Sequence, residues 1–515
     1  MTPSARTVVV GTFGVSAGEV VSVARMGART EIAEEAREAM GRARVLVDRA
    51  GESPDAVYGV STGFGLLAST RIEPGRRSEL QHALIRSHAA GMGSAVETEV
   101  VRAMMFLRVR SLCMGLSGNR PEIAGGLADL LNSGITPVVP EFGSVGASGD
   151  LAPLAHMSLV LLGEGQAELP DGRVVPGAEA LKEAGLRPLR LEVKEGLSLI
   201  NGTDGMLGML VLALADLMVL LPTADLAAAV STEGLLGTDR PFAAELHTIR
   251  PHPGQVQSAA NLRSLLSGSP ILASHRDSPH LVQDAYSTRC APQVHGAARD
   301  TVTFARQVAE RELQSAVDNP VVLPDGRLES TGNFHGEPLA FAADFLAIAA
   351  AEVGAISERR LDRILDPARS AGLPPFLASE AGVNSGLMIA QYTAASIVAE
   401  NRRLAQPASV DSIPTSGMQE DHVSMGWGAA RKLRQVLTNL ARVLAVELLA
   451  AARAIELRAP LQPSPVDAAV AELVRELGGG VGPDRFLAPE LEAVASAVRT
   501  GDVLRRAESV LGPIP

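Results

Sequence analysis

Residues 143–153 read GSVGASGDLAP, and their small side chains leave the backbone itself open to chemistry. The first seven positions hold three glycines, two serines and an alanine, and the acid Asp150 follows. Glycine loses the most conformational freedom on ordering and adopts positive φ without steric cost, so this composition favours a tight loop. A structural turn is the simplest interpretation. Apolar segments flank the run at 137–140 and 151–163, so the loop is held between buried elements, where backbone amides could react.

The tripeptide Ala147-Ser148-Gly149, together with Asp150-Leu151-Ala152-Pro153-Leu154, resembles the signature of the aromatic amino acid ammonia-lyases. In that family the glycine nitrogen attacks the alanine carbonyl, two waters leave and the serine becomes a methylidene. The product is 4-methylideneimidazol-5-one (MIO), an electrophile made from the chain. The resemblance runs from Val8 to roughly Pro460 and is closest to the histidine ammonia-lyases. It implies that Ala147, Ser148 and Gly149 form MIO and that no external cofactor is needed.

Tyr58 begins a second glycine-punctuated segment, YGVSTGFG. Residues 59–63 fit the G-x-S-x-G motif of serine hydrolases, but the strand and helix that this motif requires are not predicted around them. The resemblance instead implies a mobile loop in which Tyr58 is the catalytic base, although Ser61 stands where many relatives have Asn. A tyrosine acts as a base only if its pKa falls from about 10 toward 7, which takes ~4 kcal/mol of anion stabilisation.

Two further residues point to the substrate. His88 follows Ser87 at the end of an amphipathic segment, and Glu420 lies in the sequence QEDH. By type alone, such a histidine is more often structural, and an acid in a first helical turn more often a dipole partner. The resemblance implies that both contact the substrate side chain, and Ser-His with an acid is the combination found with histidine. A carboxylate can bind an imidazole N–H, whereas against a benzene ring it would be buried without a partner.

The remaining candidates come from three separate segments. Gln283, Tyr286 and Arg289 are spaced by about one helical turn, which predicts that they share one face of a helix. The guanidinium of Arg289 is suited to binding the substrate carboxylate. The resemblance implies a catalytic role for Tyr286, substrate contacts for Asn201, Gln283 and Arg289, and a pocket wall at Phe334. It assigns no role to His295.

Composition narrows the class of protein. The chain has 515 residues, of which 46% are hydrophobic and 20% charged, and this is typical of a globular protein with a large core. A net charge of −12 argues against nucleic acid as a partner. The two cysteines and the lack of a basic segment followed by an apolar one favour a reducing, cytoplasmic location without a membrane anchor.

No metal site is predicted from spacing. The sequence contains neither H-E-x-x-H nor paired cysteines, the two patterns that would indicate zinc. The histidines considered for this role are His252, His275, His280, His335 and His422.

Apolar spacing predicts several long helices. Their expected ranges are Asp204 to Leu221, Pro292 to Val317, Leu339 to Leu365, Glu380 to Ala405 and Glu420 to Leu457. The most apolar run, 206–221, stops at Pro222 and is too short to span a bilayer, so it is interpreted as a core helix. The last helix would carry Glu420 in its first turn.

These elements predict a mainly α protein with a long central helical bundle and a mixed, loop-rich N-terminal region carrying the MIO loop. The expected domains are 1–200, which contains both loops, 201–462, which is the bundle, and 463–515, which is a helical cap. The resemblance implies a homotetramer whose active sites draw the Tyr58, Arg289 and Glu420 regions from different subunits.

The implied reaction is removal of ammonia from L-histidine to give trans-urocanate. A phenylalanine or tyrosine lyase and a MIO-dependent 2,3-aminomutase are the alternatives on the same scaffold. A lyase of the fumarase and argininosuccinate type is disfavoured, because its usual Gly-Ser-Ser loop is missing. A non-catalytic helical scaffold is the alternative from another class.

Overall fold

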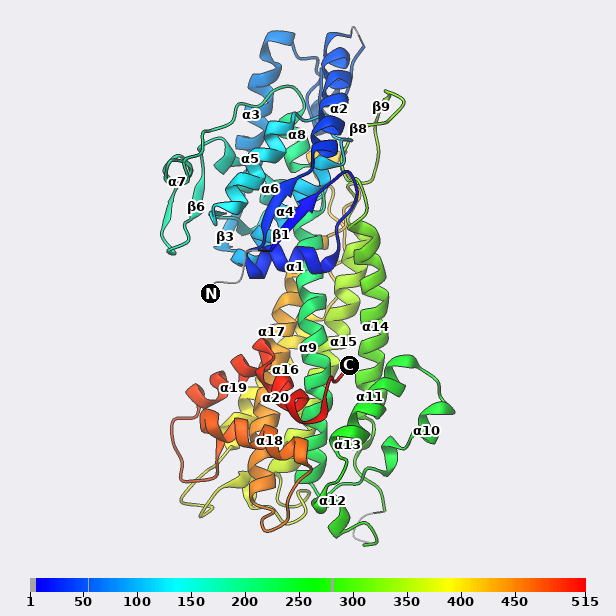
Figure 1. The fold of residues 1–515 in the computed structure, drawn as a ribbon, viewed down its shortest axis with the longest axis vertical. Helices are drawn as coiled ribbons and strands as arrows, with labels where there is room; N and C mark the ends of the chain where they lie inside the picture. Colours follow the sequence, from blue (N-terminus) through cyan, green and yellow to red (C-terminus); the bar gives the residue numbers. More distant parts are fainter. Residues whose placement is uncertain (1–5, 54, 279–281) are drawn as a thin grey trace. The chain divides into compact units, whose positions relative to one another are not determined.

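The computed structural model describes residues 6–53, 55–278 and 282–515, and its fold is mainly α-helical, as predicted (Figure 1). The chain forms two compact units, each assembled from three stretches of sequence. Unit 1 comprises Met1–Leu212, Arg306–Ala343 and Ala408–Arg431, and unit 2 comprises Ala213–Ala305, Asp344–Pro407 and Lys432–Pro515. The division into 1–200, 201–462 and 463–515 stays a prediction.

Unit 1 contains helices of moderate length and several short strands. Its complete α-helices are α1 (Ala17–Met26), α2 (Glu34–Glu52), α3 (Arg77–His88), α4 (Thr98–Cys113), α5 (Pro121–Asn132), α6 (Leu151–Leu161), α7 (Gly177–Glu183) and α8 (Glu195–Ile200). Short 3-10 turns include η1 (Gly65–Ser69), η2 (Pro74–Arg76) and η5 (Ser416–Met418). Helix α4 is the centre of this unit: it packs against α1 and α5, and its residues from Ala103 to Cys113 are all buried.

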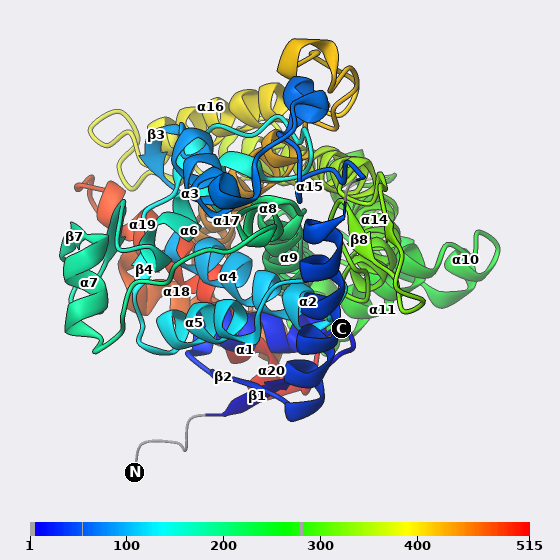
Figure 2. The same ribbon diagram turned by 90° about the horizontal axis from the view of Figure 1, so that it is seen from above.

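The strands of unit 1 pair in small sheets. They are β1 (Thr7–Val10), β2 (Arg29–Ile32), β3 (Met92–Ala95), β4 (Thr136–Pro137), β5 (Pro140–Phe142), β6 (Gln166–Glu168), β7 (Val174–Pro176), β8 (Val321–Val322) and β9 (Leu328–Glu329). Strands β1 and β2 are parallel, with Thr7 opposite Arg29, and lie side by side in Figure 2. The other pairs, β3–β5, β4–β6, β6–β7 and β8–β9, are antiparallel. Strand β5 leads directly into the glycine-rich loop, and α6 begins immediately after it.

Unit 2 contains the greater part of a bundle of long helices. These are α9 (Asp204–Gly234), α14 (Ala291–Glu312), α15 (Glu337–Leu365), α16 (Met388–Leu404) and α17 (Gly426–Glu456). Shorter helices accompany them: η3 (Arg240–Phe242), α10 (Ala244–Thr248), α11 (Pro253–Leu265), α12 (Pro270–Ser274), α13 (Tyr286–Arg289), η4 (Pro375–Leu377), α18 (Pro465–Val474), η6 (Arg475–Gly479), α19 (Ala488–Thr500) and α20 (Asp502–Leu511).

Buried polar contacts fix the bundle helices against one another within unit 2. The Glu447 carboxylate of α17 accepts hydrogen bonds from Ser231 of α9 (2.7 Å) and from the Arg360 guanidinium of α15 (2.9 Å). Both members of the Arg360–Glu447 pair are completely buried. Because a buried charge without a partner is costly, this pair makes the register of α15 against α17 energetically specific.

Four predicted helix ends are wrong. Helix α14 ends at Glu312 and not at Val317, and α16 begins at Met388 and not at Glu380. Helix α9 continues through Pro222 to Gly234, because it is buried on nearly all sides and packing outweighs the backbone hydrogen bond that a proline removes. Helix α17 begins at Gly426, so Glu420 lies outside it, in a loop where it forms an isolated bridge with Thr415. Glu420 is therefore not a partner of the helix dipole.

Helices α9, α15 and α17 are each long and apolar enough to cross a membrane by length and composition. The prediction that the apolar run of α9 is too short for this is therefore wrong. In the structure, however, the most apolar 18-residue stretch of each helix is mostly buried: 78% of it in α9, 67% in α15 and 78% in α17. The interpretation of these segments as core helices rests on that burial.

The buried pair in the bundle gives a stability prediction. Replacing Arg360 with Leu leaves the Glu447 carboxylate buried without its cation, and we expect a loss of ~3–5 kcal/mol in the free energy of unfolding. The matched control is Arg403→Leu on α16, because Arg403 forms an exposed pair with Glu400 and should change stability by less than ~1 kcal/mol. Urea denaturation followed by circular dichroism measures both, and equal losses would contradict the assignment.

Candidate active site

The glycine-rich loop between β5 and α6 has an unusual backbone. Ser148 has φ of 54° and Gly149 has φ of 81°, so two consecutive residues are left-handed, and the first of them has a side chain. A Cβ added to Gly149 would lie 2.1 Å from the Gly202 carbonyl oxygen, so no larger residue fits there. Left-handed φ at a serine costs free energy that the surrounding contacts must supply, and such strain is common at functional sites.

Backbone contacts hold this loop on both sides. The Asp150 N–H donates to the Gly202 carbonyl at 2.7 Å, and the Met425 N–H donates to the Val145 carbonyl at 2.9 Å. The Asp150 carboxylate accepts two more hydrogen bonds, both 2.9 Å, from the N–H groups of Gly205 and Met206 in the first turn of α9. Complete burial raises the pKa of this carboxyl to about 7, although the two N–H groups oppose the shift.

A chain of hydrogen bonds leads away from Ser148. The Ser148 hydroxyl donates to Asn201 Oδ1 at 2.8 Å, and Asn201 Nδ2 donates to Asp318 Oδ1 at 3.2 Å and to the Asn319 carbonyl at 2.9 Å. Asp318 in turn pairs with Lys194 Nζ at 2.7 Å, and both side chains are buried. Burial lowers the pKa of Lys194 while Asp318 opposes that change. Each link fixes the orientation of the next, so the position of the Asn201 amide depends on a buried ion pair.

Lys194 and Asp318 are functional candidates that the sequence did not reveal. Lys194 lies just before α8, and Asp318 lies after α14, in a different stretch of unit 1. Neither belongs to a recognisable motif. Charged residues such as Arg190, Glu192 and Glu195 surround Lys194 in the sequence, so local composition does not indicate that its side chain is fully buried.

Tyr58 and Glu420 lie close together in unit 1. Gly65 of η1 donates its N–H to the Tyr58 hydroxyl oxygen at 3.2 Å, and the Phe64 ring stands edge-on to the tyrosine with 6.2 Å between centroids. The Leu66 N–H donates to Ser416 Oγ at 3.3 Å, which joins η1 to η5. Burial raises the pKa of Tyr58, the Gly65 N–H lowers it, and the Glu420 charge raises it further. Within one chain, therefore, the environment opposes the shift that a tyrosine base requires.

His88 occupies the last turn of α3, where its Nδ1 lies 3.1 Å from the Ser87 hydroxyl. Burial lowers the pKa of His88, against opposing effects of the Leu84 backbone and of the Glu420 charge. The ring is therefore held neutral at pH 7, so it offers one donor and one acceptor nitrogen. Glu420 itself is oriented by the Thr415 hydroxyl, which donates to its Oε2 at 2.8 Å.

The residues at 283–289 that were predicted to contact the substrate belong to unit 2. Tyr286 and Arg289 lie on α13, and the guanidinium stands 4.6 Å from the centroid of the tyrosine ring. The Arg289 Nε donates to the Asp284 carbonyl at 3.0 Å, and Tyr286 is 71% exposed. Gln283 is exposed and precedes α13, so the prediction that all three share one helix face is wrong. His280, weighed as a metal ligand, falls outside the described residues.

His295 belongs to a buried network of polar side chains. Its Nδ1 lies 2.8 Å from Asp225 Oδ1, and Arg299 reaches the other carboxylate oxygen at 2.6 Å. Ser258 and Asn261 also donate to Asp225. All these side chains belong to unit 2, where they form a buried network between α9, α11 and α14. The residue that sequence reasoning left unassigned therefore helps to hold the bundle together.

Comparisons with known proteins agree with this geometry. The chain is 62% identical to a histidine ammonia-lyase of Streptomyces coelicolor over 509 residues, covering 99% of both chains. Its fold matches the crystal structure of a tyrosine aminomutase from Streptomyces globisporus with a TM-score of 0.92 and 39% identity, covering 99% of both chains. It matches that of a histidine ammonia-lyase from Trypanosoma cruzi with a TM-score of 0.89 and 39% identity, covering 98% of this chain and 95% of the other.

The sequence profile described as aromatic amino acid lyase matches residues 15–476. This range includes the strained tripeptide, the Tyr58 and Glu420 loops, His88 and α13. The chain belongs to the aromatic amino acid lyase family.

Proposed function

We propose that this chain is a histidine ammonia-lyase, which removes ammonia from L-histidine to give trans-urocanate. The observation that carries the proposal is the pair His88 and Glu420, which interact electrostatically within the unit that contains the Ala147-Ser148-Gly149 turn. Two polar groups that complement an imidazole are thus present in the same unit as the reactive tripeptide. The full-length similarity to histidine ammonia-lyases supports the same conclusion.

The residues of the turn fit the formation of MIO. The left-handed φ of Ser148 and Gly149 bends the chain back on itself, and the absence of a side chain at Gly149 permits its close approach to Gly202. The Ser148 hydroxyl, which would be lost, is held by the Asn201 amide. When formed, the group supplies an electrophilic carbon for the amine of the substrate.

The substrate imidazole would be recognised by hydrogen bonds from both sides. The neutral His88 ring offers a donor and an acceptor, and the Glu420 carboxylate accepts from an imidazole N–H. Phe334, which is half-buried in the segment before α15, would supply an apolar wall. A phenylalanine ring in this place would leave the carboxylate without a partner, which disfavours the aromatic substrates.

Removal of the β-proton requires a base, and Tyr58 and Glu420 are the two candidates. Glu420 is oriented by the Thr415 hydroxyl and interacts electrostatically with Tyr58. Tyr58 would need its anion stabilised by ~4 kcal/mol, while burial and the Glu420 charge raise its pKa in the isolated chain. A cation that approaches Tyr58 in the assembled enzyme would reverse that balance, and Arg289 is the residue we assign to this environment.

We further propose that the enzyme is a cytoplasmic homotetramer. In it, Gln283, Tyr286 and Arg289 of one subunit would complete the site of another, with Arg289 binding the substrate carboxylate. The 71% exposure of Tyr286 and the exposure of Gln283 support this arrangement, because both side chains remain available for contact. Tyr58 and Glu420 interact electrostatically within one chain, so in this arrangement we place both in the same subunit.

The alternative on this scaffold is an aminomutase, which the fold similarity to a tyrosine aminomutase brings into consideration. The Glu420 carboxylate argues against tyrosine as the substrate. Product analysis separates the two, because a mutase retains the amine on the product and a lyase releases it.

The first functional prediction concerns Ser148. Purified wild-type protein should have an intact mass lower than that of the translated sequence by two molecules of water, and Ser148→Ala should not. We expect Ser148→Ala to lose at least ~1,000-fold in turnover of L-histidine, since the electrophile is the main source of catalysis. Urocanate formation is followed by ultraviolet absorption. Wild-type turnover by the variant would refute the proposal.

The second concerns substrate choice. Replacing His88 with Phe removes hydrogen bonds to the imidazole, and we expect kcat/KM for L-histidine to fall by about 100-fold, equivalent to ~3 kcal/mol. The ratio of activity on L-phenylalanine to that on L-histidine should rise. His252→Phe is the control, because His252 is an exposed residue of unit 2 that caps α11 without a side-chain hydrogen bond. An unchanged ratio in His88→Phe would remove this residue from the substrate site.

The third concerns the buried ion pair behind Asn201. We expect Lys194→Met to leave the Asp318 charge uncompensated, to displace the Asn201 amide and to reduce the fraction of chains that lose two waters by roughly tenfold. The control is Lys182→Met, an exposed lysine on α7. Intact mass gives the fraction directly, and circular dichroism verifies folding. A folded Lys194→Met protein with complete dehydration would show that the pair is not needed.

A further inference from the structure

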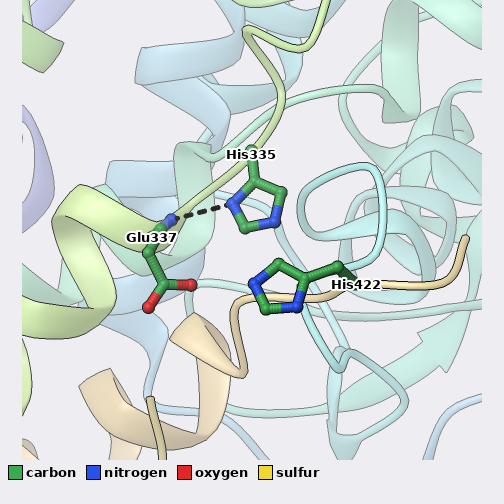
Figure 3. Close-up of side chains that lie close together, drawn as sticks. All are labelled: His335, Glu337 and His422. Carbon is green, nitrogen blue, oxygen red and sulfur yellow. Dashed lines mark hydrogen bonds between the residues drawn. The ribbon is translucent and has the colours of Figure 1, made fainter. Parts of the chain in front are cut away.

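His335, Glu337 and His422 are brought together by the fold, although their spacing matches no metal motif. His335 and Glu337 lie at the start of α15, and His422 lies in the loop before α17, so two separate stretches of unit 1 contribute. One ligand atom from each of the three side chains lies within 4.8 Å of the others (Figure 3). Among the described residues, this is the only such group of histidine, cysteine and acidic side chains.

One ring nitrogen of this cluster is available to bind a cation. His335 Nε2 is buried, and none of the described residues forms a hydrogen bond with it. The other ring nitrogen faces the Glu337 N–H at 3.4 Å, which is longer than an ordinary hydrogen bond (Figure 3). Leaving a buried polar atom unpaired costs roughly 1–3 kcal/mol, and coordination to a cation would remove that cost.

The arrangement of the rings suits a shared ion. The imidazoles of His335 and His422 are nearly parallel, at 11°, with their centroids 5.6 Å apart, and the Glu337 carboxylate lies beside the His422 ring (Figure 3). Two imidazoles and one carboxylate are a donor set typical of Zn²⁺, Co²⁺ or Ni²⁺, whereas Ca²⁺ and Mg²⁺ prefer oxygen alone. His422 is exposed, so its ring is free to turn and shorten the distances to those of a coordinated metal.

The backbone around the cluster is held in place by close contacts. A Cβ on Gly336 would lie 2.3 Å from Met206 Sδ, so the turn between His335 and Glu337 sits directly against α9. On the other side, the Met425 N–H is bonded to the Val145 carbonyl of the glycine-rich loop. Two of the ligands are therefore presented by a fixed turn and the third by a segment anchored nearby, as a preorganised site requires.

We propose that His335, Glu337 and His422 bind one divalent transition-metal ion of the Zn²⁺ type, with a coordination position left open. The ion would link the start of α15 to the segment that carries Glu420, two residues before His422. This proposal does not depend on the proposed reaction, because the ligands bind the cation whether or not MIO has formed.

The test uses the full-length protein without an affinity tag, first treated with a chelator. Titration with Zn²⁺ followed by calorimetry should show one ion per chain, and Co²⁺ should give a visible absorption band. We expect His422→Ala to weaken Zn²⁺ binding by at least ~100-fold, because loss of a ligand exceeds the effect of losing an outer partner. His422 is exposed, so this variant should fold normally.

Two controls separate the outcomes. His252→Ala removes an exposed histidine of unit 2 and should leave Zn²⁺ binding unchanged. Ser148→Ala should bind Zn²⁺ like the wild type while lacking turnover, so a failure of the reaction and a failure of the metal site are distinguishable. No binding by the wild type, or equal affinity in wild type and His422→Ala, would overturn the proposal.

Discussion

The contact between Gly149 and Gly202 is the constraint on which the site in unit 1 depends. The two backbones form an isolated parallel bridge. A Cβ on Gly149 would collide with the Gly202 carbonyl, and a Cβ on Gly202 would collide with the side chains of Arg108 and Asp204. This close approach sets Asn201 beside Ser148, and it brings Asp150 to the first turn of α9. The strain in Ser148 and the partners of its hydroxyl are therefore consequences of a single steric requirement.

Burial sets the electrostatics around that contact. Desolvation raises the pKa of Asp150 to about 7 and lowers that of Lys194, so each charge persists only with help from its partners. Backbone N–H groups of α9 donate hydrogen bonds to the Asp150 carboxylate, and Asp318 forms an ion pair with Lys194. The same low polarity raises the pKa of Tyr58. A site of this kind would interact strongly with a charged substrate. In the proposed mechanism, Tyr58 acts as a base only when a cation stabilises its anion.

The parts of the fold that sequence predicted are those that local patterns encode. Apolar periodicity located all five long helices, and the glycine content of the reactive loop indicated its conformation. The end of α9 and the start of α17 were wrong, because packing around Pro222 and the bridge at Glu420 depend on distant parts of the chain. The Lys194–Asp318 pair and the cluster of His335 with His422 could not be predicted either, since each joins separate stretches of sequence and neither carries a motif.

The fold alone does not determine the substrate, so the choice of substrate depends on a few side chains. A tyrosine aminomutase and a histidine ammonia-lyase have nearly equal structural similarity to this chain. What distinguishes the possibilities is the cost of an unpaired charge. The half-buried Glu420 carboxylate is oriented by Thr415 and interacts electrostatically with His88, whose own pKa is lowered by burial. In the proposed site, an imidazole would satisfy both groups and a benzene ring would satisfy neither. A difference of about a few kcal/mol would then select between amino acids that the same electrophile could accept.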